Sequence, residues 1–297
     1  MNLVNGYDLL GNIAIVKFNR DANLKEKKKE ALKILDKHKS VRTILEKADG
    51  FSGRLRKQKT HWILGEKTKE ALYKENGCVF RFNVDECYFS SRLSTDREEV
   101  AKQVLKSKKK EKVLVMFSGI GVYGIVIGKL AGKRAEKIVC VELNRACNRY
   151  ALDNVRRNKL TEKVEIVQGD VRRVFQTPLS TEHSNGSSSL ARRQRVSSVR
   201  NVIGKDRKVN EKFDRIFMGR PNLKDDFLDV AFSVSKKGTI IHYHGFYHEI
   251  EKKAGVIEEL ILDRAKKAKK KVRIIRIKKA GEIAPYKFRY RVDFKVL

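Results

Sequence analysis

A glycine-rich turn between an apolar strand and a helix is the feature that most constrains how this chain folds. Residues 113–117 form an apolar run, and Gly119, Gly121 and Gly124 follow it with the spacing G-x-G-x-x-G. Glycines in such a turn let the backbone bend tightly and approach a ligand closely. A turn of this kind at the carboxyl end of a strand predicts a ligand site in an open α/β sheet.

Strands alternate with helices from residue 112 onward. Helices are predicted from residue 123 to 130, at 146–158 and at 249–269, and strands at 113–117, 137–142, 164–167, 213–218, 239–243, 272–277 and 290–296. This alternation is typical of a sheet whose strands are joined by helical crossovers. Seven strands in this order predict an α/β fold with the Rossmann-like, seven-stranded sheet of a class I methyltransferase.

The chain ahead of this sheet has a different pattern. Apolar residues recur every three or four positions from Leu24 to Leu35, which predicts a helix. Short strands are predicted on either side of it, with one or two at 7–18 and others at 41–45, 79–84 and 87–89. The sequence therefore predicts a small α+β domain over residues 1–86, followed by a methyltransferase domain over residues 87–297.

One segment interrupts the second domain. Residues 176–208 are rich in Ser and Arg and show little apolar periodicity. Such a composition buries too little apolar surface to fold on its own. We expect this stretch to be a disordered surface insertion that the fold does not need.

The charge of the chain points to a polyanionic partner. Lys and Arg total 68 against 36 Asp and Glu, a formal net charge of +32. Such an excess is typical of proteins that bind nucleic acid, although a lysine-rich solvated surface is an alternative reading. No run approaches the roughly 18 apolar residues of a membrane span, and the amino terminus shows no signal-peptide pattern. We therefore expect a soluble, cytoplasmic protein that does not bind membranes.

Two acidic residues lie where a cofactor bound at the glycine turn is expected to extend. Glu142 ends the second strand about 20 residues beyond the turn, where a carboxylate accepts ribose hydroxyls. Asp170 ends the third strand, where it would accept a hydrogen bond from an adenine amino group. Because the carboxyl ends of parallel strands meet at one edge, the three positions together predict a nucleoside-type cofactor. A glycine turn beside two solvated acids, or an NAD site, are the alternatives.

Four segments carry a resemblance to a known family. Residues 83–97, which include Tyr88-Phe89-Ser90-x-Arg92-Leu93, are similar to the archaeal and eukaryotic tRNA (guanine-37-N1)-methyltransferases, and so are residues 116–121, 169–172 and 240–243. The resemblance runs from about residue 7 to the carboxyl terminus outside the insertion. It implies S-adenosylmethionine as the cofactor and, as the substrate, a tRNA whose guanosine 3′ of the anticodon is methylated at N1. It also implies a monomer without a metal ion.

The resemblance assigns roles to individual residues. It implies Arg56 and Asp96 as catalytic residues, with Asp96 as the general base. Cofactor contacts fall on Phe117, Gly119, Gly121, Glu142 and Asp170, and substrate contacts on Arg92, Arg220 and Asn222. A separate amino-terminal module that some relatives use to grip tRNA is not expected here, so residues 1–86 and the basic surface would dock the RNA.

The implied mechanism begins with the proton on guanine N1, which makes N1 a poor nucleophile. Asp96 would remove this proton, and Arg56 would donate to O6 as negative charge develops there. Without the resemblance, a helix cap is the simpler reading of Asp96 and a phosphate contact the simpler reading of Arg56.

Three departures from the family pattern keep other functions open. Val115 replaces an acidic residue at the end of the first strand, Asp96 replaces Glu, and Gly219-Arg220-Pro221 replaces Asn-Leu-Pro. The amide expected to hold the guanine is therefore absent, with Asn222 as its candidate substitute. Aminocarboxypropyl transfer to a wyosine precursor in tRNA, methylation of such a precursor at carbon, and a non-catalytic tRNA-binding role are the alternatives. His242 and His244 are expected to serve packing and polar contacts.

Overall fold

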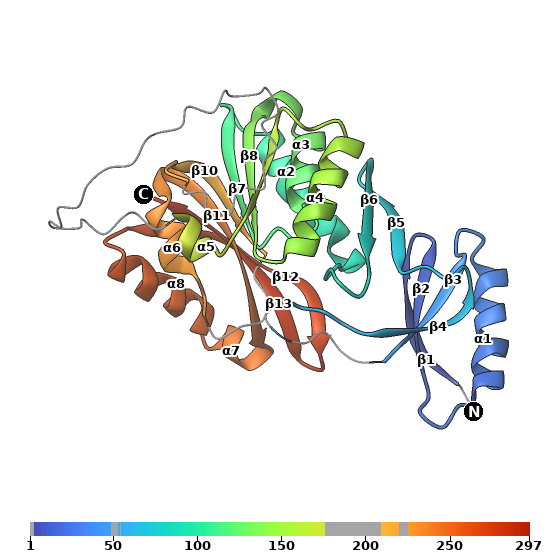
Figure 1. Cartoon of the computed structure of the whole chain (residues 1–297). Helices are drawn as coiled ribbons and strands as arrows, with labels where there is room; N and C mark the ends of the chain where they lie inside the picture. Colours follow the sequence, from blue (N-terminus) through green and yellow to red (C-terminus); the bar gives the residue numbers. More distant parts are fainter. Residues whose placement is uncertain (1–2, 49–52, 54, 176–208, 220–224) are drawn as a thin grey trace, which may run out of the picture.

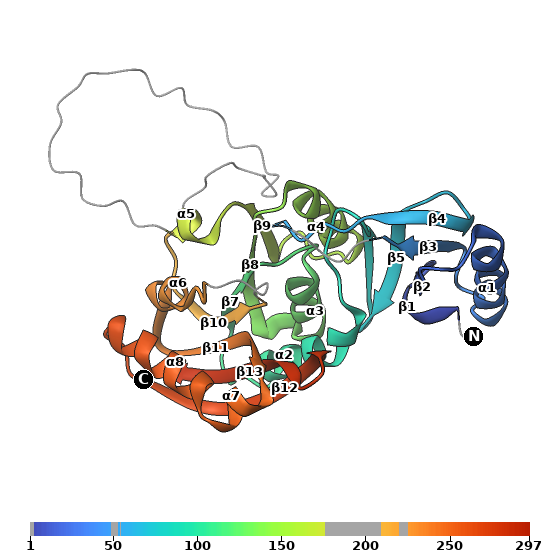
Figure 2. The same cartoon turned by 90° about the horizontal axis from the view of Figure 1, so that it is seen from below.

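The computed structural model combines a large mixed sheet with a small sheet beside it (Figure 1). It describes residues 3–48, 53, 55–175, 209–219 and 225–297. The insertion predicted at 176–208 lies outside the described residues, as do Arg220 and Asn222. Figure 2 shows the helices arranged on both sides of the large sheet.

The large sheet has seven strands in the order β12-β13-β11-β10-β7-β8-β9. Their bounds are β7 Glu111–Met116, β8 Ala135–Glu142, β9 Val164–Gln168, β10 Phe213–Met218, β11 Ser235–His248, β12 Val272–Ala284 and β13 Lys287–Val296. The five neighbouring strands β11, β10, β7, β8 and β9 run parallel to one another, whereas β13 runs antiparallel to both β11 and β12. This topology confirms the predicted Rossmann-like sheet of a class I methyltransferase.

Two helical layers bury the faces of this sheet. One layer holds α2 Ser94–Leu105, α3 Val122–Leu130 and α4 Arg145–Arg157, and the other holds α5 Val171–Phe175, α6 Leu228–Ser233, α7 Glu249–Lys253 and α8 Val256–Lys267. The side chains of the central strand β7 alternate between the two apolar cores, with Val113 and Val115 in one and Leu114 and Met116 in the other. A strand buried on both faces reads as a continuous apolar run, which is why the sequence shows it so clearly.

The amino-terminal part forms a four-stranded sheet in the order β1-β2-β3-β4. It is built from β1 Val4–Leu10, β2 Ile13–Phe18, β3 Thr43–Lys47 and β4 Thr60–Gly65, with α1 Leu24–Lys37 packed against it. Asn23 and Glu26 form a capping box at the start of α1, which satisfies amide groups that have no partner inside the helix.

A hairpin links the small sheet to the large domain. It consists of β5 Glu70–Glu75 and β6 Cys78–Asn83. The side-chain amides of Asn154 in α4 and of Asn158, which caps the carboxyl end of α4, exchange hydrogen bonds with the backbone of Arg81 and Val79 in β6. One apolar core runs from Ile13 of the small sheet through Phe82 of the hairpin to α3. The two sheets therefore share buried contacts.

The structure corrects several predicted elements. Residues 87–89 form a loop rather than a strand, and the helix predicted at 249–269 is two helices, because Gly255 adopts a left-handed φ of +78° between them. The sequence reading missed β4 and β5, because their apolar runs are only three residues long and do not alternate with polar residues. Among the described residues, no helix has the length and apolar character needed to cross a membrane.

Candidate active site

The carboxyl ends of the large sheet's strands open onto a cavity of about 870 Å³, a volume that includes space open to solvent. The glycine turn after β7, the ends of β8 and β9, and the loop between β3 and β4 contribute to its wall. It brings together five of the predicted site residues, Arg56, Phe117, Gly119, Glu142 and Asp170, and Gly219 also lines it.

The glycine turn holds a rare backbone conformation. Phe117 has a φ of +61° and Gly119 a φ of +56°. A left-handed non-glycine residue is unusual and clusters at functional sites. A Cβ built on Gly119 would meet only the carbonyl oxygen of Tyr88, at 3.8 Å. A ligand can therefore approach this backbone directly.

Gly121 lies at the start of α3. It does not line the cavity, and it precedes α3 with a φ of +83°. A Cβ on Gly121 would lie 3.3 Å from Ile125 and 3.4 Å from Ala151. Its glycine is required by conformation and by packing between α3 and α4, and the structure does not direct this position at the cofactor.

Glu142 is a partly buried carboxylate held by backbone amides. The N–H of Gly119 donates to it at 2.9 Å, and the N–H of Asn144 donates at 2.7 Å. Burial raises the pKa of Glu142, while these hydrogen bonds act in the opposite direction. Each carboxylate oxygen has a further lone pair for a hydroxyl donor. Asp170 also lines the cavity, and it accepts the N–H of Arg172 at 2.8 Å.

A second cavity adjoins the first. It has a volume of about 1090 Å³, again including open space, and shares Arg56, Tyr88 and Arg289 with the first cavity. The guanidinium carbon of Arg56 lies 5.3 Å from the centre of the Tyr88 ring, and Arg56 has a left-handed φ of +52°. Arg92 lines the second cavity and pairs with Asp8 at 3.0 Å. The two cavities therefore meet around Tyr88.

The structure does not bring Asp96 to either cavity. Asp96 is buried beneath them, where it accepts hydrogen bonds from Tyr123 at 2.7 Å and Arg291 at 2.6 Å, and His244 lies 3.2 Å away. Burial opposes ionisation, but His244, Arg291 and Tyr123 together hold the pKa of this carboxyl well below its usual range. A buried carboxylate stabilised in this way is a weak proton acceptor. This geometry offers the predicted general base no open route to a substrate.

A stacked pair of aromatic rings connects Gly219 with Asp96, two positions that depart from the family pattern. A Cβ on Gly219 would lie 2.9 Å from the ring of Phe217. Phe217 stacks on Tyr123 with ring centres 3.6 Å apart, and Tyr123 donates to Asp96. The ring of Phe217 thus fills the space that a side chain at position 219 would need. Arg220 and Asn222, the nearby substrate candidates, lie outside the described residues.

The two histidines singled out in the sequence are buried. His242 contacts Asp293 at 2.6 Å and Arg215 at 2.9 Å, and His244 lies beside Asp96. Burial lowers the pKa of both rings. They form part of a buried polar layer under the cavities rather than part of the cavity wall.

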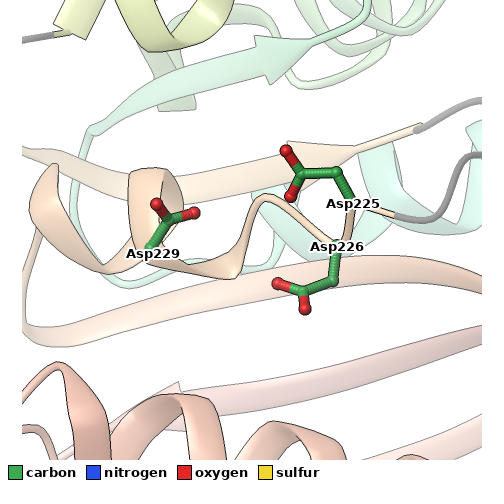
Figure 3. Close-up of side chains that lie close together, drawn as sticks. All are labelled: Asp225, Asp226 and Asp229. Atoms are coloured by element: carbon green, nitrogen blue, oxygen red, sulfur yellow. The ribbon is translucent and has the colours of Figure 1, made fainter.

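An acidic cluster precedes and enters α6. Carboxylate oxygens of Asp225, Asp226 and Asp229 lie within 4.8 Å of one another, and Figure 3 shows Asp225 and Asp226 directed to opposite sides of the backbone. Arg172 donates to Asp225 and Asp229, and Arg264 donates to Asp226. The cluster is an ion-pair network that ties this segment to α5 and α8.

Sequence reasoning missed several residues of the cavity wall. Phe227 and Phe246 line the first cavity, and Tyr88 and Arg289 line both. Tyr88 lies inside the motif Tyr88-Phe89-Ser90-x-Arg92-Leu93, so the sequence carries a signal for it. No local pattern distinguishes Arg289 from the many other basic residues of the chain.

Comparison with known proteins identifies the family. A model of the TRM5/TYW2 methyltransferase domain matches residues 71–184 and 190–275, more than half of the chain. The Taw22 protein of Nanoarchaeum equitans, named tRNA (guanine(37)-N(1))/4-demethylwyosine(37)-methyltransferase, is 31% identical over 98% of this chain and 99% of its own length.

A second relative comes from Pyrococcus abyssi. Its tRNA (guanine(37)-N(1))-methyltransferase Trm5b is 28% identical, over 99% of this chain and 76% of that protein. The crystal structure of the wild-type Trm5b has a TM-score of 0.74 and covers 98% of this chain and 75% of that one. Sequence and structure agree, and this chain belongs to the TRM5/TYW2 methyltransferase family.

Proposed function

We propose that this protein transfers a methyl group from S-adenosylmethionine to N1 of guanosine 37 in tRNA. The observation that carries the proposal is the pair of adjoining cavities, one with a nucleoside-type site and the other with basic residues, which meet at Arg56, Tyr88 and Arg289. Two relatives that match nearly the whole chain are named for this reaction.

The first cavity suits the cofactor. Glu142 would accept the ribose hydroxyls, Asp170 the adenine amino group, and the open backbone at Gly119 would lie against the rest of the molecule. Apolar Leu143 and Val171 flank these acids. When bound, S-adenosylmethionine supplies the electrophilic methyl group.

The residues of this chain would prepare the nucleophile. Arg56 would donate to O6 of the guanine, so that negative charge left by the N1 proton has a partner. We propose that Asp96 acts at a distance, as a positioning residue that holds Tyr123 and Arg291 under the site. Arg92 would contact the tRNA at the outer wall of the second cavity.

The small sheet is proposed to dock the RNA. Residues 1–86 would form this docking domain and residues 87–297 the methyltransferase domain, acting as a monomer. Asp8, Lys47 and Arg56 of the amino-terminal part face the second cavity, so RNA held by the small domain would lie beside the transferred methyl group.

Gly219 favours a second candidate. Because glycine has no side-chain amide, the wall at position 219 carries no group that would select guanine over a modified base. The Nanoarchaeum relative is named for 4-demethylwyosine as well as for guanine. Methylation of this precursor at carbon, as an additional activity, is therefore the candidate to test beside the first.

Mass spectrometry of tRNA nucleosides tests the proposal. We expect 1-methylguanosine after incubation of the enzyme and S-adenosylmethionine with a transcript that carries G37, and none with a matched transcript that carries A37. An aminocarboxypropyl adduct, or methyl groups found only on 4-demethylwyosine in tRNA isolated from a suitable strain, would refute it. Absence of S-adenosylmethionine binding in calorimetry would instead indicate a non-catalytic tRNA-binding protein.

A further inference from the structure

Arg289 lies at the junction of the two cavities and forms part of the wall of both. Its Nη2 donates to the Tyr88 hydroxyl at 3.4 Å, and its guanidinium carbon lies 4.9 Å from the centre of the Phe246 ring. Its Nε is buried and makes no hydrogen bond within the part of the chain that the structure describes. The guanidinium is thus held in place by one ring and one hydroxyl, with donors left over.

The absence of a counter-charge sets Arg289 apart from its neighbours. Arg97, Arg215 and Arg291 are buried, and each pairs with a carboxylate: Arg97 with Glu75, Arg215 with Glu111, and Arg291 with Asp96. Arg289 has no carboxylate partner among the described residues. Because a partly desolvated cation without a counter-charge is unfavourable, this arrangement suits an anionic ligand.

The order of the strands indicates which ligand this is. Arg289 lies on β13, and Glu142, the proposed ribose contact, ends β8, four strands away in the sheet. At the usual spacing of neighbouring strands, four steps amount to about 19 Å. Glu142 and Asp170 line only the first cavity, whereas Arg289 lines both. Arg289 therefore belongs to the region where the substrate base meets the cofactor.

We propose that Arg289 is a second catalytic arginine, which acts with Arg56 to hold the negative charge that forms on O6 of the substrate base. The inference rests on the proposed function. The N1–H bond breaks and its proton passes to water in the second cavity. The electron pair left on N1 forms the bond to the methyl carbon, and the bond from that carbon to sulfur breaks with its pair left on sulfur.

Two cations beside O6 also promote the loss of the N1 proton, a step that buried Asp96 is poorly placed to assist. A positive charge near an acid favours its ionised form, so guanine N1 would lose its proton to water at a lower pH than in free solution. Arginine suits this role because it stays protonated at every relevant pH. The site then needs no basic side chain in contact with N1.

The charge of Arg289 also acts on the pKa values of other titratable groups around it. Burial lowers the pKa of His244 on β11, and the charge of Arg289 adds to this effect. Burial raises the pKa of Tyr123 on α3 well above the ordinary value, and the charge of Arg289 acts in the opposite direction. Asp8 is paired with Arg92 at the outer wall of the second cavity, which also carries Lys47, Arg56, Tyr88 and Glu282. Removal of Arg289 therefore changes the charge at the base and, as a smaller effect, the charge that acts on the buried His244 and Tyr123.

Steady-state kinetics of Arg289→Gln over a range of pH, with a G37 transcript and S-adenosylmethionine, tests the inference. We expect kcat at neutral pH to fall on the order of 10²–10³-fold, as for loss of one donor to a developing anion. The rise of kcat with pH should shift upward by about one unit or more, so that high pH restores part of the rate. Arg289→Lys should keep more activity than Gln and a smaller shift.

Two controls separate this role from others. Arg276→Gln removes one exposed charge from the neighbouring strand β12 and should leave kcat and its pH profile unchanged. Binding of S-adenosylhomocysteine to Arg289→Gln, measured by calorimetry, should match wild type within about threefold, which also shows that the variant is folded.

Three results would overturn the inference. A large loss of S-adenosylhomocysteine affinity would assign Arg289 to the carboxylate of the cofactor. A higher KM of Arg289→Gln for tRNA, with an unchanged kcat and pH profile, would assign Arg289 to a phosphate contact. In either case, 1-methylguanosine formed by the wild type would leave the proposed function standing. If the wild type forms no 1-methylguanosine at all, the proposed function fails and the inference fails with it.

Discussion

Gly119 is the residue at which backbone conformation and ligand approach depend on each other. Its φ is +56°, its N–H binds Glu142, and the space beyond its Cα is open towards the cavity. One methyl group added at Gly119 would lie where the proposed cofactor approaches, so binding at this position depends on a single atom.

Gly119→Ala should weaken binding of S-adenosylmethionine by roughly 5- to 150-fold, which corresponds to the 1–3 kcal/mol of a small overpacking. Calorimetry measures this. Gly238→Ala is the matched control, because Gly238 has a similar left-handed φ of +89° with nothing within 4 Å of its Cβ. Equal affinities in the two variants would show that Gly119 does not face the cofactor.

Asp96→Asn should destabilise the protein. Because the change leaves Arg291, which is fully buried, with one charged partner fewer, we expect the free energy of unfolding to fall by about 2–4 kcal/mol. Denaturant unfolding followed by circular dichroism gives the value, and Asp153→Asn at a half-exposed pair with Arg157 serves as the control. Unchanged stability with a large loss of turnover, rescued at high pH, would support the general base predicted from the sequence.

At the scale of elements, the register of β10 brings Asp214 beside the start of β7. Asp214 accepts hydrogen bonds from Lys109 and from the N–H of Lys112, both at the amino-terminal end of β7, and from Lys236 at the start of β11. These contacts join three segments that lie far apart along the chain, at the end of the sheet opposite the cavity.

Protonation of Asp214 should destabilise the sheet at acid pH. Burial opposes ionisation, but the hydrogen bonds from Lys109 and Lys112 outweigh it and lower the pKa of Asp214 to about 2 from 3.8. Because the folded-state pKa is depressed, its stabilisation is fully present above pH 3.8 and is lost as pH falls towards about 2. Asp214→Asn should therefore cost about 1–2 kcal/mol at pH 7 and almost nothing near pH 2. Denaturant titrations at both pH values test this, and an equal loss at both would contradict it.

At the scale of the whole molecule, charge governs how the protein meets RNA. The formal net charge is +32, and basic residues of the small sheet and of β13 both reach the second cavity. An excess of this size makes association with a polyanion depend on the release of counterions.

The affinity for tRNA should therefore fall more than about tenfold between 50 and 200 mM salt. Filter binding or fluorescence anisotropy measures it, and S-adenosylmethionine binding in the same buffers is the internal control, with a change of less than about twofold. If the tRNA affinity is as insensitive to salt as the cofactor affinity, the basic residues are a solvated surface rather than an RNA-binding one.

Local sequence pattern is enough to predict the large sheet and the edge at which the glycine turn, Glu142 and Asp170 meet. Buried parallel strands leave continuous apolar runs, and the ends of β7, β8 and β9 follow one another along the chain, so the glycine turn, Glu142 and Asp170 could be assigned to one edge from local pattern alone.

The positions of Arg289 and Asp96 depend instead on contacts between segments that lie far apart along the chain. Arg289 reaches the cavities because β13 inserts antiparallel between β11 and β12, and Asp96 is buried because α2 packs where Arg291 and Tyr123 can contact it. Arg289 contacts Tyr88, which lies 201 residues away along the chain, and Arg291 contacts Asp96, which lies 195 residues away. Local periodicity carries no record of such contacts, because it reports which face of an element is buried and not which residue lies opposite.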